Sequence, residues 1–127
     1  MSQDYEAAAR TMTSGMLGMR LWVITTKTVV DREKALPQLQ AHLEHQVRLE
    51  KEGVMFGAGP LRNPDGSRAD LGLIVIRAAN AEEARRIADS DPMHRAGMRT
   101  YTLHEWTLNE GRITVSVDLS DQRCRLA

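Results

Sequence analysis

The chain has 127 residues, 42% of them hydrophobic, which suits one domain with an apolar core. Lysine plus arginine and aspartate plus glutamate each total 17, so the formal net charge is zero. Without an overall field to attract nucleic acid or an anionic membrane, neither partner is expected. A net charge near zero also favours self-association.

The only cysteine, Cys124, can form neither an internal disulfide nor a cysteine-based metal cluster. Residues 1–19 lack the apolar core of a secretion signal, and no stretch approaches the ~18 apolar residues of a membrane helix. These features predict a soluble, cytoplasmic protein. We expect an N-terminal extension at 1–19, a domain at 20–119 and a frayed tail at 120–127.

The first half of the domain predicts a strand, a helix and a second strand. Residues 21–28 are rich in β-branched and aromatic side chains, which is typical of a strand. Asp31 is a plausible cap for a helix from 32 or 33 to 52, and Gly53 would end it. Residues 54–60 then predict the second strand.

The apolar residues of this helix share one face at about 100° per residue. We expect that face to be buried against the sheet. Its members are Leu36, Leu39, Leu43 and Val47, with Leu49 at the edge. Pro37 lies within the helical stretch, so a start nearer Leu36 is an alternative.

The second half continues with a turn, a strand, a helix and a last strand. Residues 63–66, Asn-Pro-Asp-Gly, predict the turn, and residues 71–77 the strand that follows it. Asn80 is expected to cap a helix that ends near Asp89. Arg99–Leu108 alternates like a strand.

After a turn, residues 113–117 predict one extra C-terminal strand, either at a sheet edge or on an arm that reaches a partner. The element order is therefore β-α-β-β-α-β plus one strand, the ferredoxin-like α+β arrangement. It places two helices on one face of a four-stranded antiparallel sheet, and the other face needs cover. A second copy of the chain is the expected cover.

Several segments together, in their order and spacing, resemble the YCII family. The similarity extends over residues 21–108. The segments are Ala41-His42-Leu43, Leu49, the run Glu52 to Pro60 with its Ala-Gly-Pro ending, Ala81-Glu82-Glu83-Ala84, Ala88-Asp89-Ser90-Asp91-Pro92, Ala96-Gly97 and the strand to Trp106.

The resemblance implies a ferredoxin-like homodimer, a dimeric α/β barrel related to muconolactone isomerase. It also implies an active site made of His42 and Asp91. Members of that family with an assigned reaction act on small cyclic or aromatic breakdown products, and one such reaction is the dehydrohalogenation of a chlorinated hydroquinone.

His42 and Asp91 each have a purely structural alternative. Spacing alone favours His42 as a histidine at the core edge, bonded to a backbone carbonyl, whereas the resemblance favours a general acid–base role. Asp91 precedes Pro92, which keeps Asp91 extended and suits a helix cap. The same carboxylate can orient an imidazole, because it has two oxygens.

Other residues are weaker candidates for substrate binding. His94 is three residues beyond Asp91 and is expected to share its pocket. Gly57, Gly59 and Pro60 would supply a pocket floor, or would only bend the strand end. Arg99 would add a cation. His45 is expected to face solvent, the facing of His104 is ambiguous, and no third ligand supports a metal site at His42 and His45.

We therefore expect an enzyme that needs no cofactor and moves protons on a small organic substrate, as an isomerase or a lyase (dehydrohalogenase). A non-catalytic module that binds a small ligand is the main alternative. A cofactor-free oxygenase is a further possibility within the enzyme class. An interaction subunit whose C-terminal strand pairs with another protein is the least favoured.

Overall fold

The computed structural model describes residues 2–126. The chain divides into two compact units. The larger is Arg20–Thr107, and the smaller combines the segments that flank it in sequence, up to Met19 and from Leu108.

The larger unit contains the predicted β-α-β-β-α-β series, with a short additional helix before the last strand. Its elements are β1 (Met19–Thr28), α2 (Arg32–Lys51), β2 (Met55–Arg62), β3 (Arg68–Ile76), α3 (Ala81–Asp89), α4 (Pro92–Arg95) and β4 (Arg99–Leu108). The prediction for the last strand agrees with β4 at both ends.

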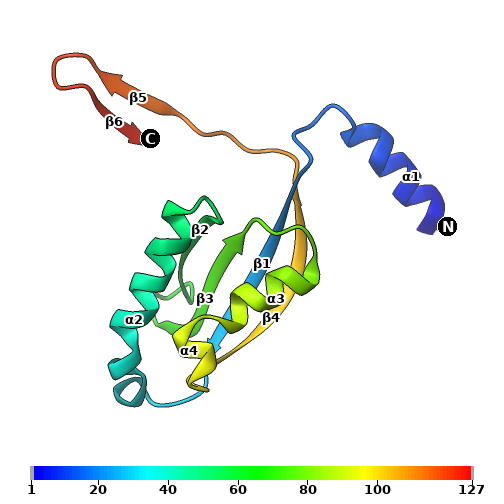
Figure 1. Ribbon diagram of the computed structural model, residues 1–127. Coiled ribbons are helices and arrows are strands. Elements are labelled where there is room, and N and C mark those ends of the chain that lie inside the picture. Colours follow the sequence, from blue (N-terminus) through cyan, green and yellow to red (C-terminus); the bar gives the residue numbers. More distant parts are fainter. Residues whose placement is uncertain (1, 127) are drawn as a thin grey trace. The chain divides into compact units, whose positions relative to one another are not determined.

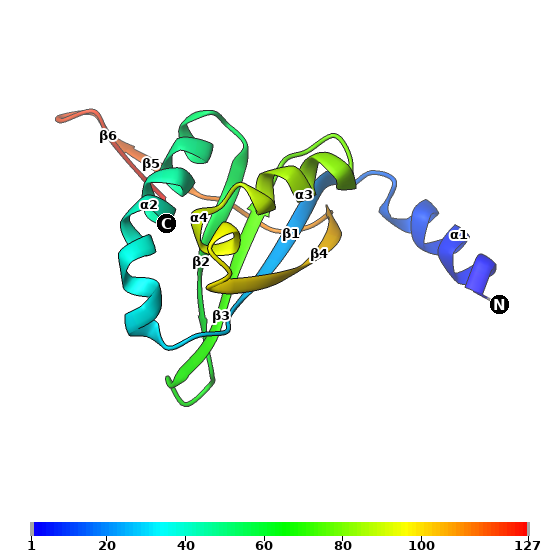
Figure 2. The same ribbon diagram turned by 60° about the horizontal axis from the view of Figure 1, so that its bottom comes forward.

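The four strands form one sheet in the order β2-β3-β1-β4. β3 is antiparallel to both β1 and β2, and Ile74 at its centre lies opposite Ile24 on one side and Ala58 on the other. α2, α3 and α4 lie on the same side of this sheet (Figure 1, Figure 2). The ferredoxin-like α+β fold is confirmed.

The main core lies between the sheet and α3. Alternation along β1 sends Trp22 and Ile24 to the helix side, where they pack with Ile76 of β3. α3 contributes the small residues Ala84 and Ala88, which are almost fully buried and let the helix approach the sheet closely. The indole N–H of Trp22 donates to the carbonyl of Ala78 at 3.2 Å, so this large ring is satisfied inside the core.

The apolar stripe of α2 faces away from the core, which corrects the prediction that it would be buried. Its exposed fractions are 65% for Leu36, 37% for Leu39, 51% for Leu43 and 52% for Val47. The buried residues of α2 are instead Ala35 and His42. These two are seven residues apart, about two turns, and so lie on one line along the helix.

The residues that α2 places toward the sheet explain this orientation. A small alanine and a histidine that finds a carboxylate partner face the sheet side, and the larger leucines lie about 50–110° around the helix. Its many charged residues also keep α2 polar.

In residues 2–126 no helix is both long and apolar enough to cross a membrane.

Local capping signals in the second half are confirmed. The side chain of Asn80 accepts a hydrogen bond from the backbone N–H of Glu83 at 2.9 Å. The Glu83 carboxylate accepts from the backbone N–H of Ala79 at 2.8 Å. This reciprocal arrangement satisfies backbone donors at the start of α3. Asp31 also precedes its helix, but its side chain makes no cap hydrogen bond.

The smaller unit contains a helix and a hairpin. α1 (Ser2–Thr13) lies within the predicted N-terminal extension. β5 (Val115–Asp118) pairs antiparallel with β6 (Arg123–Leu126) in a sheet of their own. The predicted C-terminal strand therefore does not extend the main sheet, and the expected frayed tail contains a strand that completes the hairpin.

Candidate functional site

A cleft of about 430 Å³ opens between α2 and the β2–β3 hairpin. Leu39, His42 and Leu43 line it from α2, and Gly59 and Pro60 line it from β2. Gly72 of β3, Thr26 of β1 and Arg99 of β4 also line the cleft. The cleft thus draws on α2 and all four strands of the main sheet, and it is wide enough for a small ring.

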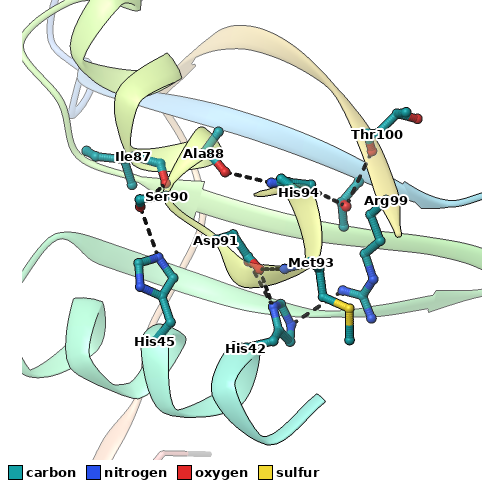
Figure 3. A network of polar contacts seen from close by, with 11 residues as sticks. His42, His45, Ile87, Ala88, Ser90, Asp91, Met93, His94, Arg99 and Thr100 are labelled. Carbon is teal, nitrogen blue, oxygen red and sulfur yellow. Dashed lines mark hydrogen bonds and ion pairs between the residues drawn. The ribbon is translucent and has the colours of Figure 1, made fainter. Parts of the chain in front are cut away.

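His42 and Asp91 meet beside this cleft although 49 positions separate them in the sequence. The Nδ1 atom of His42 lies 2.8 Å from both carboxylate oxygens of Asp91 (Figure 3). Both residues are buried, with 5% and 4% of their surface exposed. Such a short contact away from water fixes the orientation of the imidazole ring.

The charge of Asp91 determines which nitrogen of His42 carries the proton. Burial opposes ionisation of Asp91, but hydrogen bonds from His42 and from the Met93 N–H outweigh it, and the pKa of Asp91 lies below its usual value. A carboxylate only accepts hydrogen bonds, so His42 donates from Nδ1. In the neutral ring, Nε2 then holds a lone pair that can accept a proton.

Arg99 lies on the other side of the ring. Its guanidinium Nη1 is 3.4 Å from Nε2 of His42 (Figure 3), and both residues line the cleft. Burial lowers the pKa of the Arg99 guanidinium, and the carboxylate of Asp91 opposes that effect. A cation therefore lies beside Nε2 of His42.

Asp91 has a second, structural role at the same time. Its Oδ1 accepts a hydrogen bond from the backbone N–H of Met93 at 2.8 Å, so Asp91 caps α4. Pro92 occupies the first turn of α4, as is usual in such caps. One carboxylate therefore serves both the cap and the histidine, which were the two alternatives for this residue.

His94 does not line the cleft. Its Nδ1 donates to the carbonyl oxygen of Ala88 at 2.6 Å, because a carbonyl can only accept. In the neutral ring, Nε2 then accepts from the hydroxyl of Thr26 at 2.8 Å. His94 therefore orients Thr26, which is itself a wall of the cleft.

Comparison with protein-family models identifies the family of this chain. The model of the YCII-related domain matches residues 16–107, most of the chain. The chain belongs to the YCII-related family. Among curated proteins, none matches the YCII-related chain significantly.

A solved structure has the same fold as this YCII-related domain. It is the 5-chloro-2-hydroxyhydroquinone dehydrochlorinase TftG from Burkholderia phenoliruptrix AC1100, in complex with 2,5-dihydroxybenzoquinone. The two chains superpose with a TM-score of 0.57 at 18% sequence identity, and the match covers 68% of this chain and 93% of that one. At this identity the similarity establishes the fold.

The YCII-related fold brings some of the sequence candidates together and separates others. His42, Gly59, Pro60 and Arg99 all line the cleft, and Asp91 contacts His42 from behind. Gly57 does not line it. It pairs with Val75, and the β-bulge between Met55 and Gly57 turns it to the sheet face opposite the helices.

The remaining histidines lie outside the cleft. The ring of His94 is held between Ala88 and Thr26, as described above. His45 is half-buried, and its Nε2 lies 3.2 Å from the Ser90 hydroxyl, so it does not simply face solvent. His104 is exposed. Within residues 2–126 there is no group of three or more histidine, cysteine, aspartate or glutamate residues that could hold a metal ion.

Sequence reasoning missed three arginines of the cleft, Arg32, Arg62 and Arg68. Arg62 and Arg68 flank the Asn63-Pro64-Asp65-Gly66 turn and are partners in the β2–β3 register. The predicted hairpin was therefore a signal that two cations would lie side by side. Arg32 directly follows the helix-cap position, and nothing in its local sequence indicates a cleft.

Proposed function

We propose that this YCII-related protein is a cofactor-independent enzyme that transfers protons on a small oxygenated ring, as an isomerase or a lyase. The observation that carries the proposal is the buried His42–Asp91 pair, whose histidine lines a cleft of about 430 Å³. A histidine held in one orientation by a carboxylate is suited to general acid–base work.

In this proposal Nε2 of His42 accepts a proton from a ring carbon or hydroxyl of the substrate. Asp91 stabilises the imidazolium that forms, and Arg99 pairs with the negative charge that develops on a ring oxygen. In an isomerisation, His42 returns the same proton to another carbon. In an elimination, the electrons of the broken bond form a double bond and a leaving anion departs with its own bonding pair.

The structural neighbour supports the substrate class. TftG is a dehydrochlorinase, and its structure holds 2,5-dihydroxybenzoquinone, a small oxygenated ring. This chain has the same fold and a cleft that suits a ligand of that size. We infer by analogy that hydroxylated or halogenated hydroquinones, quinones and lactones are the compounds to test first.

Proton exchange on such compounds in deuterated water, followed by NMR, tests the proposal without knowledge of the net reaction. The wild type should exchange a ring proton of its substrate, and His42→Gln should reduce the rate by about 10²-fold or more. His104→Gln, a histidine change at an exposed position, is the matched control and should retain the wild-type rate.

Three outcomes would contradict the proposal. Exchange that survives in His42→Gln would exclude His42 as the base. Ligands that raise the melting temperature of the wild type while none is turned over would favour the binding module instead. Oxygen uptake during turnover would show that the enzyme is an oxygenase and not a proton-transfer enzyme.

A further inference from the structure

The side chains that line the cleft carry an excess of positive charge. Arginines reach it from four separate elements, and a single acidic side chain, Asp70, lines it. The four are Arg32 at the start of α2, Arg62 in β2, Arg68 in β3 and Arg99 in β4. The lining side chains therefore have a formal charge of +3 when His42 is neutral.

This excess is local. Over the whole chain, lysine plus arginine equals aspartate plus glutamate at 17 each. A cleft with three more cations than anions in a neutral chain concentrates positive potential at one place, where low-dielectric walls strengthen it. Such a cleft attracts anions.

Contacts within the protein leave most of these cations free to bind a ligand. Arg32 reaches Asp70 only at 3.7 Å, and both side chains are about half exposed. Arg62 donates to the backbone carbonyl of Gly66, which carries no net charge. In the described part of the chain, the buried Nε of Arg99 has no hydrogen-bond partner.

Asp91 does not line the cleft, although its charge acts on Arg99. Its oxygens accept from Nδ1 of His42 and from the Met93 N–H, behind the imidazole ring. The cleft therefore has two chemical regions. One is the proton-transfer end at His42 and Arg99, and the other is the arginine group of Arg32, Arg62 and Arg68.

We infer that the substrate is a small ring that carries a carboxylate, with the ring oxygen at His42 and Arg99 and the carboxylate at Arg32, Arg62 and Arg68. The planar guanidinium matches a carboxylate with two parallel hydrogen bonds, which a lysine cannot provide. Leu39, Leu43 and Pro60 give the ring apolar walls. This inference rests on the proposed function in taking the cleft as the substrate site.

Binding of matched ring compounds tests the inference independently of turnover. The probes are 2,5-dihydroxybenzoate and hydroquinone, which share the ring hydroxyls and differ in the carboxylate, with 2,5-dihydroxybenzenesulfonate as an anion of different geometry. Titration calorimetry of the wild type should show clearly tighter binding of the carboxylate. Arg62→Gln and Arg68→Gln should each weaken that binding about 5-fold, and the double variant about 10-fold or more.

Hydroquinone binding should change less than about 2-fold in the same variants, because the neutral ring makes no ion pair. Arg86→Gln removes the same charge from an exposed site on α3 and controls for the overall field. Equal affinity of the wild type for 2,5-dihydroxybenzoate and hydroquinone would overturn the inference. So would carboxylate binding that falls equally in Arg86→Gln, or a sulfonate that binds as tightly as the carboxylate.

These results separate the two proposals. If His42→Gln abolishes exchange while the carboxylate has no effect on affinity, the carboxylate inference fails and the proposed function stands. If the arginine variants lose carboxylate binding but no compound is turned over, the cleft binds carboxylated rings and the enzymatic proposal fails.

Discussion

The His42 ring is held between a carboxylate at Nδ1 and a guanidinium at Nε2, and the carboxylate contact is almost completely shielded from water. Removing one member of a buried ion pair leaves the other uncompensated, at a cost of about 3–5 kcal/mol when the pair is charged. Alanine at position 42 would therefore test stability together with catalysis. Glutamine can still donate to Asp91, which is why it is the better variant.

The lowered pKa of Asp91 makes stability depend on pH in a definite direction. Because the folded-state pKa lies below the usual 3.8, folding favours the carboxylate, and this contribution is fully present above pH 3.8. It is lost as pH falls through the lowered folded-state value. Asp91→Asn removes it, so the variant should be less stable than the wild type near neutral pH.

Urea denaturation of the wild type and Asp91→Asn over a series of pH values measures this effect. The difference in unfolding free energy should be greatest above pH 3.8 and should shrink at lower pH. A difference that stays constant through that range would show that the charge of Asp91 does not contribute to stability.

At the scale of elements, close packing of β3 against β1 and β2 forms the floor of the cleft. Gly72 lies opposite Thr26 in one register and Pro60 in the other. A Cβ at position 72 would approach the Cγ2 of Thr26 to 3.0 Å and the Gly59 carbonyl to 3.7 Å. The first distance is tighter than an ordinary Cβ contact, so the Thr26 side chain would have to move by a few tenths of an ångström.

Gly72→Ala should therefore destabilise the protein by about 1–3 kcal/mol, as overpacking does. Thr26→Ser removes the Cγ2 methyl group that a Cβ at position 72 would contact, and it retains the hydroxyl that bonds to His94. The double variant should recover much of the loss, which denaturant titration of both single variants and the double variant would show as non-additivity. Strictly additive effects would mean that the contact with Thr26 is not the cause.

At the scale of the whole chain, two separate sets of apolar side chains of the larger unit face solvent. The first is the α2 stripe of Leu36, Leu39, Leu43 and Val47. The second lies on the sheet face opposite the helices, where Phe56 and Trp106 are in edge-to-face contact and are 37% and 38% exposed. Large exposed apolar patches mark interaction surfaces.

Self-association therefore stays a prediction from both the sequence and the exposed surface. Sedimentation of the wild type should give a mass that is a multiple of 14.2 kDa at high protein concentration. Val47→Glu tests the α2 stripe and Trp106→Glu tests the sheet face, and the change at the true interface should shift the equilibrium to the monomer. A wild type that stays monomeric at every concentration would contradict the prediction.

Local signals in the sequence determined the elements of the larger unit. The Asn80 cap, the turn at 63–66 and the alternation of Arg99–Leu108 each depend on neighbouring residues, and the structure agrees with all three. The β-α-β-β-α-β order then determined the sheet, because few topologies accommodate that series. His42 and Asp91 became a pair through the family resemblance, since spacing alone favoured other roles for both.

Tertiary packing decided three features of the structure that no local sequence pattern contains. A helical wheel gives the angles between side chains but not the direction of the core, so the burial of Ala35 and His42 in place of the leucine stripe emerged only in three dimensions. The hairpin of β5 and β6 required a partner for each strand. The arginine cleft depends on four elements that line one cavity, and a charge assembled from residues that far apart in sequence has no local signature.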